Sequence, residues 1–239
     1  MNRHGVHSPF VFELIEKVFK EQGSHYERLE SIRKGFLSNP ARLQIEDLGA
    51  GSRSNLGANR SVQEIASQSL SSGKQCRLLA RLVQHLQIQH VLEFGTCLGL
   101  SAAYMSEAGA KVISMEGSTN LHEIARNSFC KEGKGPDFRL GAFDQLLPDI
   151  LEELPQLDMA FVDGNHTKEA TERYFAMLLP YVHDHTVLLF DDIHWSSGMD
   201  SAWDLIKKHP RVTLSIDLFW CGMLFFRPGL SGEHFTIRH

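Results

Sequence analysis

The chain has 239 residues, of which 42% are hydrophobic, and a formal net charge of −5. This length suffices for one substantial hydrophobic core, and the acidic balance provides no basic surface for nucleic acid or an anionic membrane. No apolar stretch approaches the roughly 18–20 residues of a membrane span, and the widely spaced cysteines are typical of a reducing compartment. We therefore expect a cytoplasmic protein that binds neither nucleic acid nor membranes.

Residues 1–70 carry mainly helical patterns. The stretch SPFVFELIEKVFKEQ (8–22) begins with Ser-Pro and spaces its apolar residues as one face of a helix does. Residues 61–70 and 74–87 also predict helices, whereas the Gly-, Ser- and Asn-rich residues 45–60 predict a loop. We expect residues 1–70 to form a helical cap or lid and residues 71–239 to form the main domain.

Strand-like and helical patterns alternate from residue 90 onward. Five apolar runs, each followed by a helical stretch, lie at residues 90–94, 111–116, 137–140, 157–162 and 186–190. Such alternation predicts a doubly wound, mostly parallel α/β sheet of the Rossmann-like kind. Two final runs, at 212–219 and 222–228, are too close for a crossover helix and predict an antiparallel hairpin. The expected architecture is a seven-stranded sheet with a C-terminal hairpin and an N-terminal helical extension.

Two glycine-rich stretches are candidates for binding a nucleotide-type cofactor. VLEFGTCLGLS (91–101) follows a strand and opens a helix, where a glycine turn and a helix N-terminus can meet a ligand. Glu116 ends the next strand, where a carboxylate can accept both hydroxyls of a ribose. IEDLGAGS (45–52) has no following strand with a terminal acid. The context selects residues 91–101 as the cofactor loop.

The glycine spacing separates the candidate cofactors. Dinucleotides favour G-x-G-x-x-G, whereas Gly95 and Gly99 stand here in an E-x-G-x-x-x-G arrangement that begins at Glu93. In this arrangement, in the acid of the next strand and in the terminal hairpin, the sequence resembles the class I S-adenosylmethionine-dependent methyltransferases. The resemblance implies S-adenosylmethionine as the cofactor, and the spacing disfavours an NAD-dependent oxidoreductase.

Three acidic residues follow neighbouring strands of the predicted sheet. Asp163 follows one strand, and Asp191 and Asp192 follow the next. Asp158 enters its strand about 16 Å away, at the opposite edge. Because adjacent strands lie about 4.8 Å apart, we expect the three carboxylates to converge and, unneutralised, to repel one another. An all-oxygen set favours Mg²⁺, or else Mn²⁺ or Ca²⁺, and solvated or helix-capping acids are the alternative.

At these acids the resemblance narrows to the metal-dependent O-methyltransferases of the catechol, caffeoyl-CoA and sugar type, over about residues 70–227. It implies that Asp163, Asp191 and Asp192 are the metal ligands and that His166 is the general base. The cofactor contacts that it implies are Glu93, Gly95, Thr96, Gly99, Ser101, Glu116, Gly117, Phe143, Asp144 and Asp163. Ser71 or Ser72 is expected near the methionine end of the cofactor.

A mechanism for methyl transfer to a hydroxyl group follows from these residues. A divalent ion lowers the pKa of a bound hydroxyl and fixes its place, and a mostly neutral His166 removes the proton. His194, Trp195 and Trp220 are candidates for the wall of the acceptor pocket, with simple packing as the alternative for each.

The expected activity is divalent-metal-dependent O-methylation of a small hydroxylated acceptor. Two alternatives stay open: a methyltransferase that needs no metal, and a non-catalytic domain that keeps the fold for partner binding. The sequence does not specify the acceptor among catechols, other phenols, sugars and antibiotic-like scaffolds. It also leaves open whether the chain forms a homodimer.

Overall fold

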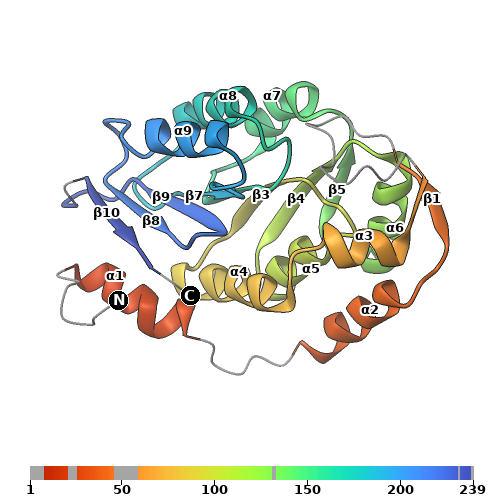
Figure 1. The fold of residues 1–239 in the computed structure, drawn as a ribbon. Coiled ribbons are helices and arrows are strands. Elements are labelled where there is room, and N and C mark those ends of the chain that lie inside the picture. The colour runs from red at the N-terminus through yellow and green to blue at the C-terminus, as the bar shows by residue number, and fades with distance from the viewer. Residues whose placement is uncertain (1–7, 21–25, 46–58, 131–132, 231, 238–239) are drawn as a thin grey trace.

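The described part of the chain centres on one large β-sheet. The computed structural model describes residues 8–20, 26–45, 59–130, 133–230 and 232–237. The strands of this sheet are β3 (His90–Phe94), β4 (Lys111–Glu116), β5 (Asp137–Leu140), β6 (Met159–Val162), β7 (Val187–Asp191), β8 (Leu214–Asp217), β9 (Cys221–Phe225) and β10 (Glu233–Thr236). Within the described ranges they form an eight-stranded sheet in the order β10-β8-β9-β7-β6-β3-β4-β5 (Figure 1).

The strand pairing confirms the predicted α/β class. Strands β5, β4, β3, β6 and β7 run parallel, and β9 runs antiparallel to both β7 and β8. The C-terminal hairpin is therefore present. β10 pairs parallel with β8 and adds an eighth strand to the seven that we expected. Its side chains alternate between partly buried and exposed, which suits a short edge strand.

The order in which successive strands join the sheet reverses at β3. Strand β4 lies on one side of β3, and β6, which comes later in the chain, lies on the other. Open α/β sheets bind ligands outside the carboxyl ends of their strands at such a switch point. The residues that follow β3, β4, β6 and β7 are therefore the place to look for a site.

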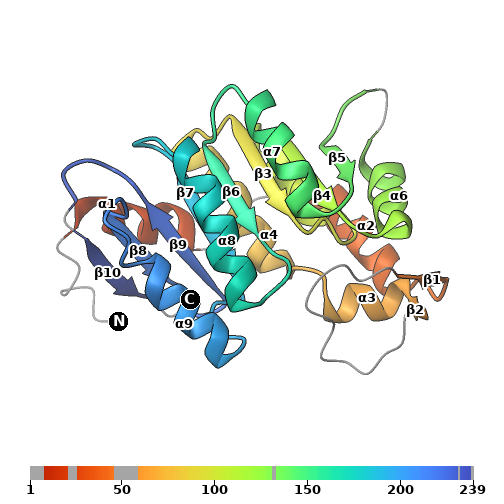
Figure 2. The ribbon, with the colours of Figure 1, turned by 90° about the horizontal axis from the view of Figure 1, so that it is seen from above.

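Helices cover both faces of the sheet (Figures 1 and 2). One face carries α4 (Gly73–Leu86), α5 (Leu100–Glu107) and α6 (Thr119–Phe129), and the other carries α7 (Phe143–Glu153), α8 (Lys168–Leu178) and α9 (Ser197–Ile206). The 3-10 turn η3 (Leu179–Tyr181) directly follows α8 in the chain. Alternate residues of a strand point to opposite faces. Val91 of β3 accordingly joins one hydrophobic core, and Leu92 and Phe94 join the other.

The N-terminal segment packs on the α4 face. Its elements are α1 (Pro9–Leu14), the π-helical η2 (Ile15–Phe19), α2 (Glu27–Leu37), β1 (Arg42–Gln44), β2 (Asn59–Ser61) and α3 (Val62–Gln68). Leu14, Leu29 and Phe36 share a buried cluster with Leu79 of α4. The helices predicted before residue 90 are present, whereas most of the loop predicted at 45–60 lies outside the described residues. In the part of the chain that the structure describes, no helix combines the length and apolarity of a membrane span.

Candidate functional site

The glycine loop between β3 and α5 brings the ends of β3 and β6 into contact. Gly95 has a φ of +94°, and a Cβ there would lie 2.0 Å from the carbonyl oxygen of Asp163. Gly99 has a φ of +82° and is the N-cap of α5, and a Cβ on it would lie 2.9 Å from Cβ of Ala125. Glycine is the residue that tolerates both the dihedral angles and the close approach. The loop therefore depends on both glycines of the sequence pattern.

Glu93 is a fully buried carboxylate behind this loop. It accepts hydrogen bonds from Ser114 and Ser101, and Thr96 Oγ1 lies 2.6 Å from Ser114 Oγ. Burial raises the pKa of Glu93 to about 8, although the two serine hydrogen bonds act in the opposite direction. Among the described residues, its Oε1 has no hydrogen-bond partner. Because a buried acceptor without a partner is unfavourable, Glu93 is suited to receive a donor group of a ligand.

Glu116 ends β4 beside the same loop. Its two oxygens accept hydrogen bonds from the backbone N–H groups of Cys97 and Ser118, each at 2.9 Å, and Gly117 adds a further backbone hydrogen bond. Burial raises the pKa of Glu116, and these backbone bonds oppose the rise. The carboxylate thus ties the loop to β4. Since a carboxylate has about four lone-pair sites, Glu116 keeps capacity to accept from a ligand hydroxyl.

Phe143 and Asp144 begin α7, next to the end of β6. The ring of Phe143 packs edge-on against Phe94, with centroids 5.5 Å apart, and covers Gly164, where a Cβ would lie 2.9 Å from the ring. Asp144 is exposed and pairs with Arg173 of α8 through two hydrogen bonds of 2.8 and 2.9 Å. Phe143 is therefore an apolar wall beside the end of β6, whereas the Asp144 carboxylate already has a protein partner. Their contacts with adenine stay a prediction.

The three predicted acids and His166 lie together at the carboxyl edge of the sheet. His166 Nε2 is 3.6 Å from Asp163 Oδ1 and 4.0 Å from Asp192 Oδ2. The side chains of Asp163 and Asp191 share a hydrogen bond. Asp158 bonds instead to the backbone N–H groups where β3 begins, at the opposite edge. The structure thus brings together the acids that the strand ends predict and separates them from Asp158.

Burial and like charge both act on these carboxylates. Burial raises the pKa of Asp163, and the nearby His166 counteracts the rise. Burial also raises the pKa of Asp191 well above its usual range, and the negative charges of Asp163 and Asp192 add to the effect. Asp191 Oδ1 is buried and, in the described ranges, lacks a hydrogen-bond partner. A shared proton or a bound cation would relieve this repulsion.

The acids have the chemistry of a hard-cation site but are not assembled as one. As the side chains stand, no group of three or more His, Cys, Asp or Glu residues in the described part of the chain could hold a metal ion. The donors are nonetheless carboxylate oxygens, which Mg²⁺, Mn²⁺ and Ca²⁺ prefer, and Asp191 Oδ1 lacks a protein partner. The residue types therefore fit a divalent cation, whose binding stays a prediction.

Four described residues at this edge have a left-handed backbone. The φ angles are 51° at Cys97, 53° at Asn165, 52° at Asp192 and 75° at Phe219. Such conformations at non-glycine residues cost about 1–3 kcal/mol each and cluster at functional sites. The N–H of Asp192 donates to the carbonyl oxygen of Trp220 at 2.7 Å. This turn keeps the Asp192 side chain beside His166 instead of letting it diverge from Asp191.

His194, one of the predicted wall residues, is held by two carboxylates. Its Nδ1 lies 2.6 Å from Asp200 Oδ1 and its Nε2 lies 3.0 Å from Asp217 Oδ2. Burial lowers the pKa of His194, but the hydrogen bonds to the two acids outweigh burial and raise it. The ring of Phe219, which is 72% exposed, lies 5.3 Å from the imidazole. Phe219 was not among the predicted wall residues, although it directly precedes Trp220 in the hairpin turn.

The two serines before α4 have different roles. The Ser71 side chain interacts with Asp163, where it lowers the pKa of that carboxyl, and so reaches the acid set. Ser72 is the N-cap of α4 and exchanges hydrogen bonds of 2.7 and 3.3 Å with Gln75. Of the two, Ser71 is therefore the one that contacts the candidate site.

Comparison with known proteins assigns the segment that holds this site. Residues 92–193 match a family described as a methyltransferase domain. They include the glycine loop, Glu116, His166 and all three acids. This segment is a methyltransferase domain. The resemblance to class I methyltransferases is thereby confirmed.

Known proteins similar to the methyltransferase domain include O-methyltransferases. A catechol O-methyltransferase of Niastella koreensis is 27% identical in an alignment of 145 residues that covers 58% of this chain and 65% of that protein. An O-methyltransferase from Bacillus cereus, solved in complex with SAH, superposes with a TM-score of 0.60 at 19% identity over 90% of this chain and 97% of that one. An SAH-bound methyltransferase from Podospora anserina gives a TM-score of 0.65 at 15% identity, over 93% and 97% of the two chains. At these identities the solved structures establish a shared fold.

Proposed function

We propose that the protein is an S-adenosylmethionine-dependent O-methyltransferase that methylates a hydroxyl group of a small acceptor. The methyltransferase domain supports the reaction class, and the catechol O-methyltransferase of Niastella koreensis supports oxygen as the methylated atom. The observation that carries the proposal is the meeting of His166 with Asp163 and Asp192 beside the glycine loop. Cofactor loop and candidate base thereby share one edge of the sheet.

The residues around the glycine loop would bind the cofactor. When bound, S-adenosylmethionine would supply the methyl group. Glu93 would accept from its ammonium group through the unpartnered Oε1, and Glu116 would accept from the ribose hydroxyls. Phe143 would provide an apolar wall for the adenine. Thr96 and Ser101 support this arrangement, because Ser101 bonds directly to Glu93 and Thr96 does so through Ser114.

His166 would take the proton from the acceptor hydroxyl. A positioned general base contributes about 10²–10⁴-fold to a rate. The carboxylates of Asp163 and Asp192, 3.6 and 4.0 Å from Nε2, would orient the imidazole and stabilise its protonated form. His166 also stands directly before Thr167, the N-cap of α8, which places the ring at a fixed helix start.

Asp163, Asp191 and Asp192 would hold a divalent cation, with Mg²⁺ preferred over Mn²⁺ and Ca²⁺. Such an ion would lower the pKa of the acceptor hydroxyl and fix its place. Support comes from the all-oxygen donor set and from the buried Asp191 Oδ1 without a partner. The three carboxylates would also exchange mutual repulsion for a shared counter-charge.

A methyltransferase that needs no metal is the second candidate. The hydrogen bond between Asp163 and Asp191 favours it, because a shared proton neutralises part of the buried charge without an ion. In this candidate His166 would still remove the proton, and the acids would orient the imidazole.

Aromatic side chains around the acids favour a flat acceptor. Phe219 is 72% exposed and lies beside His194, and Trp195 is 42% exposed. Aromatic faces stack well on a planar ring. We therefore expect a catechol or another phenol as acceptor before a sugar. The cytoplasmic location and the domain boundary at residue 70 stay predictions, and a homodimer stays open.

Methyl transfer to catechol and other phenols tests the proposal directly. We expect turnover with Mg²⁺, a large fall with excess EDTA, and recovery when Mg²⁺ is restored. His166→Gln should lower kcat by about 10²–10⁴-fold. Asp163→Asn should also lower turnover, and Asp149→Asn, in an exposed acid of α7, is the matched control. Absence of calorimetric binding of S-adenosylmethionine would end the proposal. Unchanged turnover in EDTA and in Asp163→Asn would select the metal-independent candidate.

A further inference from the structure

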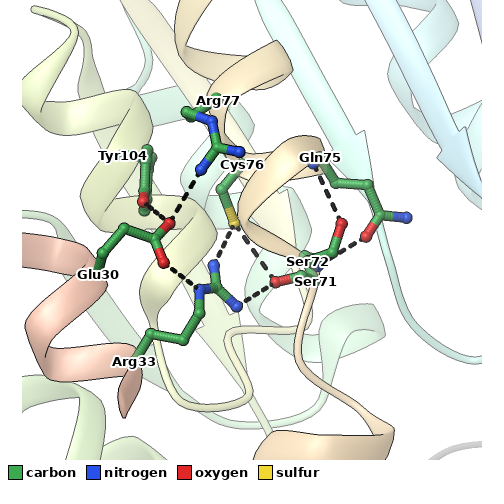
Figure 3. Close-up of polar contacts among 8 residues, drawn as sticks. All are labelled: Glu30, Arg33, Ser71, Ser72, Gln75, Cys76, Arg77 and Tyr104. Carbon is green, nitrogen blue, oxygen red and sulfur yellow. Dashed lines mark hydrogen bonds and ion pairs between the residues drawn. The ribbon is translucent and has the colours of Figure 1, made fainter. Parts of the chain in front are cut away.

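A buried polar network joins α2 to the start of α4 (Figure 3). Arg33 of α2 donates from Nη1 to the carbonyl oxygen of Ser71 at 2.6 Å and from Nη2 to Cys76 Sγ at 3.3 Å. Its Nε lies 3.4 Å from Glu30 Oε2. The arginine is buried, and a planar guanidinium holds its partners in one fixed arrangement. Arg33 therefore fixes the main chain at Ser71 relative to α2.

Glu30 docks α2 independently of Ser71. Its Oε1 accepts from Arg77 Nη1 at 3.2 Å and from the hydroxyl of Tyr104. Arg77 lies on α4 and the buried Tyr104 on α5, so one carboxylate joins three helices (Figure 3). Gly73 leaves room for it, because a Cβ there would lie 2.6 Å from Glu30 Oε1. Docking of the helix is thus secured without the Arg33 bond to Ser71, and that bond needs another explanation.

Ser71 connects this network with the candidate site. Its carbonyl oxygen accepts from Arg33 at 2.6 Å, and its side chain interacts with Asp163, where it lowers the pKa of that carboxyl. Asp163 in turn faces His166. Without Arg33, the carbonyl would keep only the weak bond from Cys76 Sγ at 3.6 Å. Ser71 would then be held firmly only through its connection to α4, and its hydroxyl would no longer be fixed against Asp163.

We propose that Arg33 is a positioning residue for the candidate site. It holds the Ser71 carbonyl, this hold fixes the Ser71 hydroxyl against Asp163, and helix α2 is thereby coupled to the edge where the cofactor would bind. The inference rests on the proposed function, because it assigns Asp163 to a cofactor site. Couplings of this kind typically change an affinity by about 5–150-fold. We expect an effect near the lower end, since the contact passes through one residue.

Calorimetric titration of S-adenosylhomocysteine into the full-length protein tests the coupling. The variants are Arg33→Ala, Arg33→Lys, Ser71→Ala and the double variant Arg33→Ala/Ser71→Ala. Arg28→Ala is the matched control, because Arg28 lies on the same helix and pairs with Glu107 at the exposed surface. We expect Arg33→Ala and Ser71→Ala each to raise the Kd about tenfold, the double variant to add nothing further, and Arg28→Ala to keep the wild-type Kd. Arg33→Lys retains the positive charge but not the planar guanidinium that donates to two partners at once, so we expect an intermediate Kd.

The outcomes separate the inference from the proposed function. Failure of the wild-type protein to bind the ligand overturns the proposed function and the coupling with it. Wild-type binding with an unchanged Kd in the Arg33 variants overturns the coupling alone. Additive effects in the double variant, or an equal effect of Arg28→Ala, would mean that Arg33 only stabilises α2, and also overturn it. If Arg33→Ala does not fold, Arg33→Lys replaces it in the same double-variant comparison.

Discussion

Gly95→Ala should force apart the ends of β3 and β6. The new Cβ would lie 2.0 Å from the carbonyl oxygen of Asp163 and 3.0 Å from its carbonyl carbon. Both are main-chain atoms, so no side chain can rotate away, and the strand ends must separate. The φ of +94° adds strain of about 1–3 kcal/mol, and overpacking adds about 1–3 kcal/mol. Together they amount to about 2–6 kcal/mol, a large part of a typical unfolding free energy of about 5–15 kcal/mol.

Gly109→Ala isolates the two contributions. Gly109 has a φ of +113° but nothing within 4 Å of its added Cβ, so alanine there has the unfavourable dihedral without the collision. The difference in unfolding free energy between the two variants therefore measures the close approach, at about 1–3 kcal/mol. Urea unfolding followed by circular dichroism gives both values. Equal losses in the two variants would refute the close contact between Gly95 and Asp163.

Ligand affinity provides a second readout for the same pair. Gly95→Ala moves the main chain of Asp163, whose side chain contacts Ser71 and His166. We expect calorimetric affinity for S-adenosylhomocysteine to fall in Gly95→Ala and to stay at the wild-type value in Gly109→Ala. A fall of the same size in both variants would mean that stability, not the geometry at Asp163, governs binding.

Three further perturbations test the charges and the packing. Burial raises the pKa of Glu93 from 4.5 to about 8, so the ligand-free protein should lose stability as pH rises through this interval, by up to about 1.4 kcal/mol per pH unit. Glu93→Gln should reduce that slope in urea titrations, although the raised pKa values of Glu116, Asp163 and Asp191 leave part of it in place. A slope equal to that of the wild-type protein would exclude Glu93 as a source. The pKa of His194 is raised, so its charged form stabilises the fold at low pH, and this stabilisation is lost as pH rises through the raised pKa. His194→Gln should therefore reduce stability more at about pH 5.5 than at about pH 9. Gly73→Ala should displace the Glu30 carboxylate and speed amide hydrogen exchange in α2 while leaving α8 unchanged.

The sequence predicts most of the sheet because each central strand is a short apolar run followed by a helical stretch. The hairpin of β8 and β9 is predictable too, since its connection is too short for a crossover. Strand β10 could not be predicted from the sequence, for a physical reason. Glu233–Thr236 alternates between partly buried and exposed side chains, and its strand conformation comes from pairing with β8. Local β-propensity is a poor predictor of a strand that forms only by pairing with a neighbouring strand.

The carboxyl edge was predictable in composition but not in geometry. Parallel strands end at one edge, so the acids that follow β6 and β7 must share it. Whether Asp192 stays near His166 depends on a φ of 52° at Asp192 and on its bond to the Trp220 carbonyl, which comes from the hairpin turn. No local pattern contains that bond, because it joins segments that only the folded sheet brings together.

The same reasoning explains why α2 could not be assigned a role from sequence. Arg33 and Ser71 are 38 positions apart, and Arg33 belongs to no recognisable motif. Their contact requires α2 to dock on α4 and α5, which Glu30 achieves through partners on both helices. Motif residues such as Gly95 allow the chemistry of a site to be predicted from the sequence, because that chemistry requires those residue types at that spacing. Residues that hold the motif in place are set by packing, so a buried arginine on a helix outside the matched segment can govern the site and leave no trace in its motif.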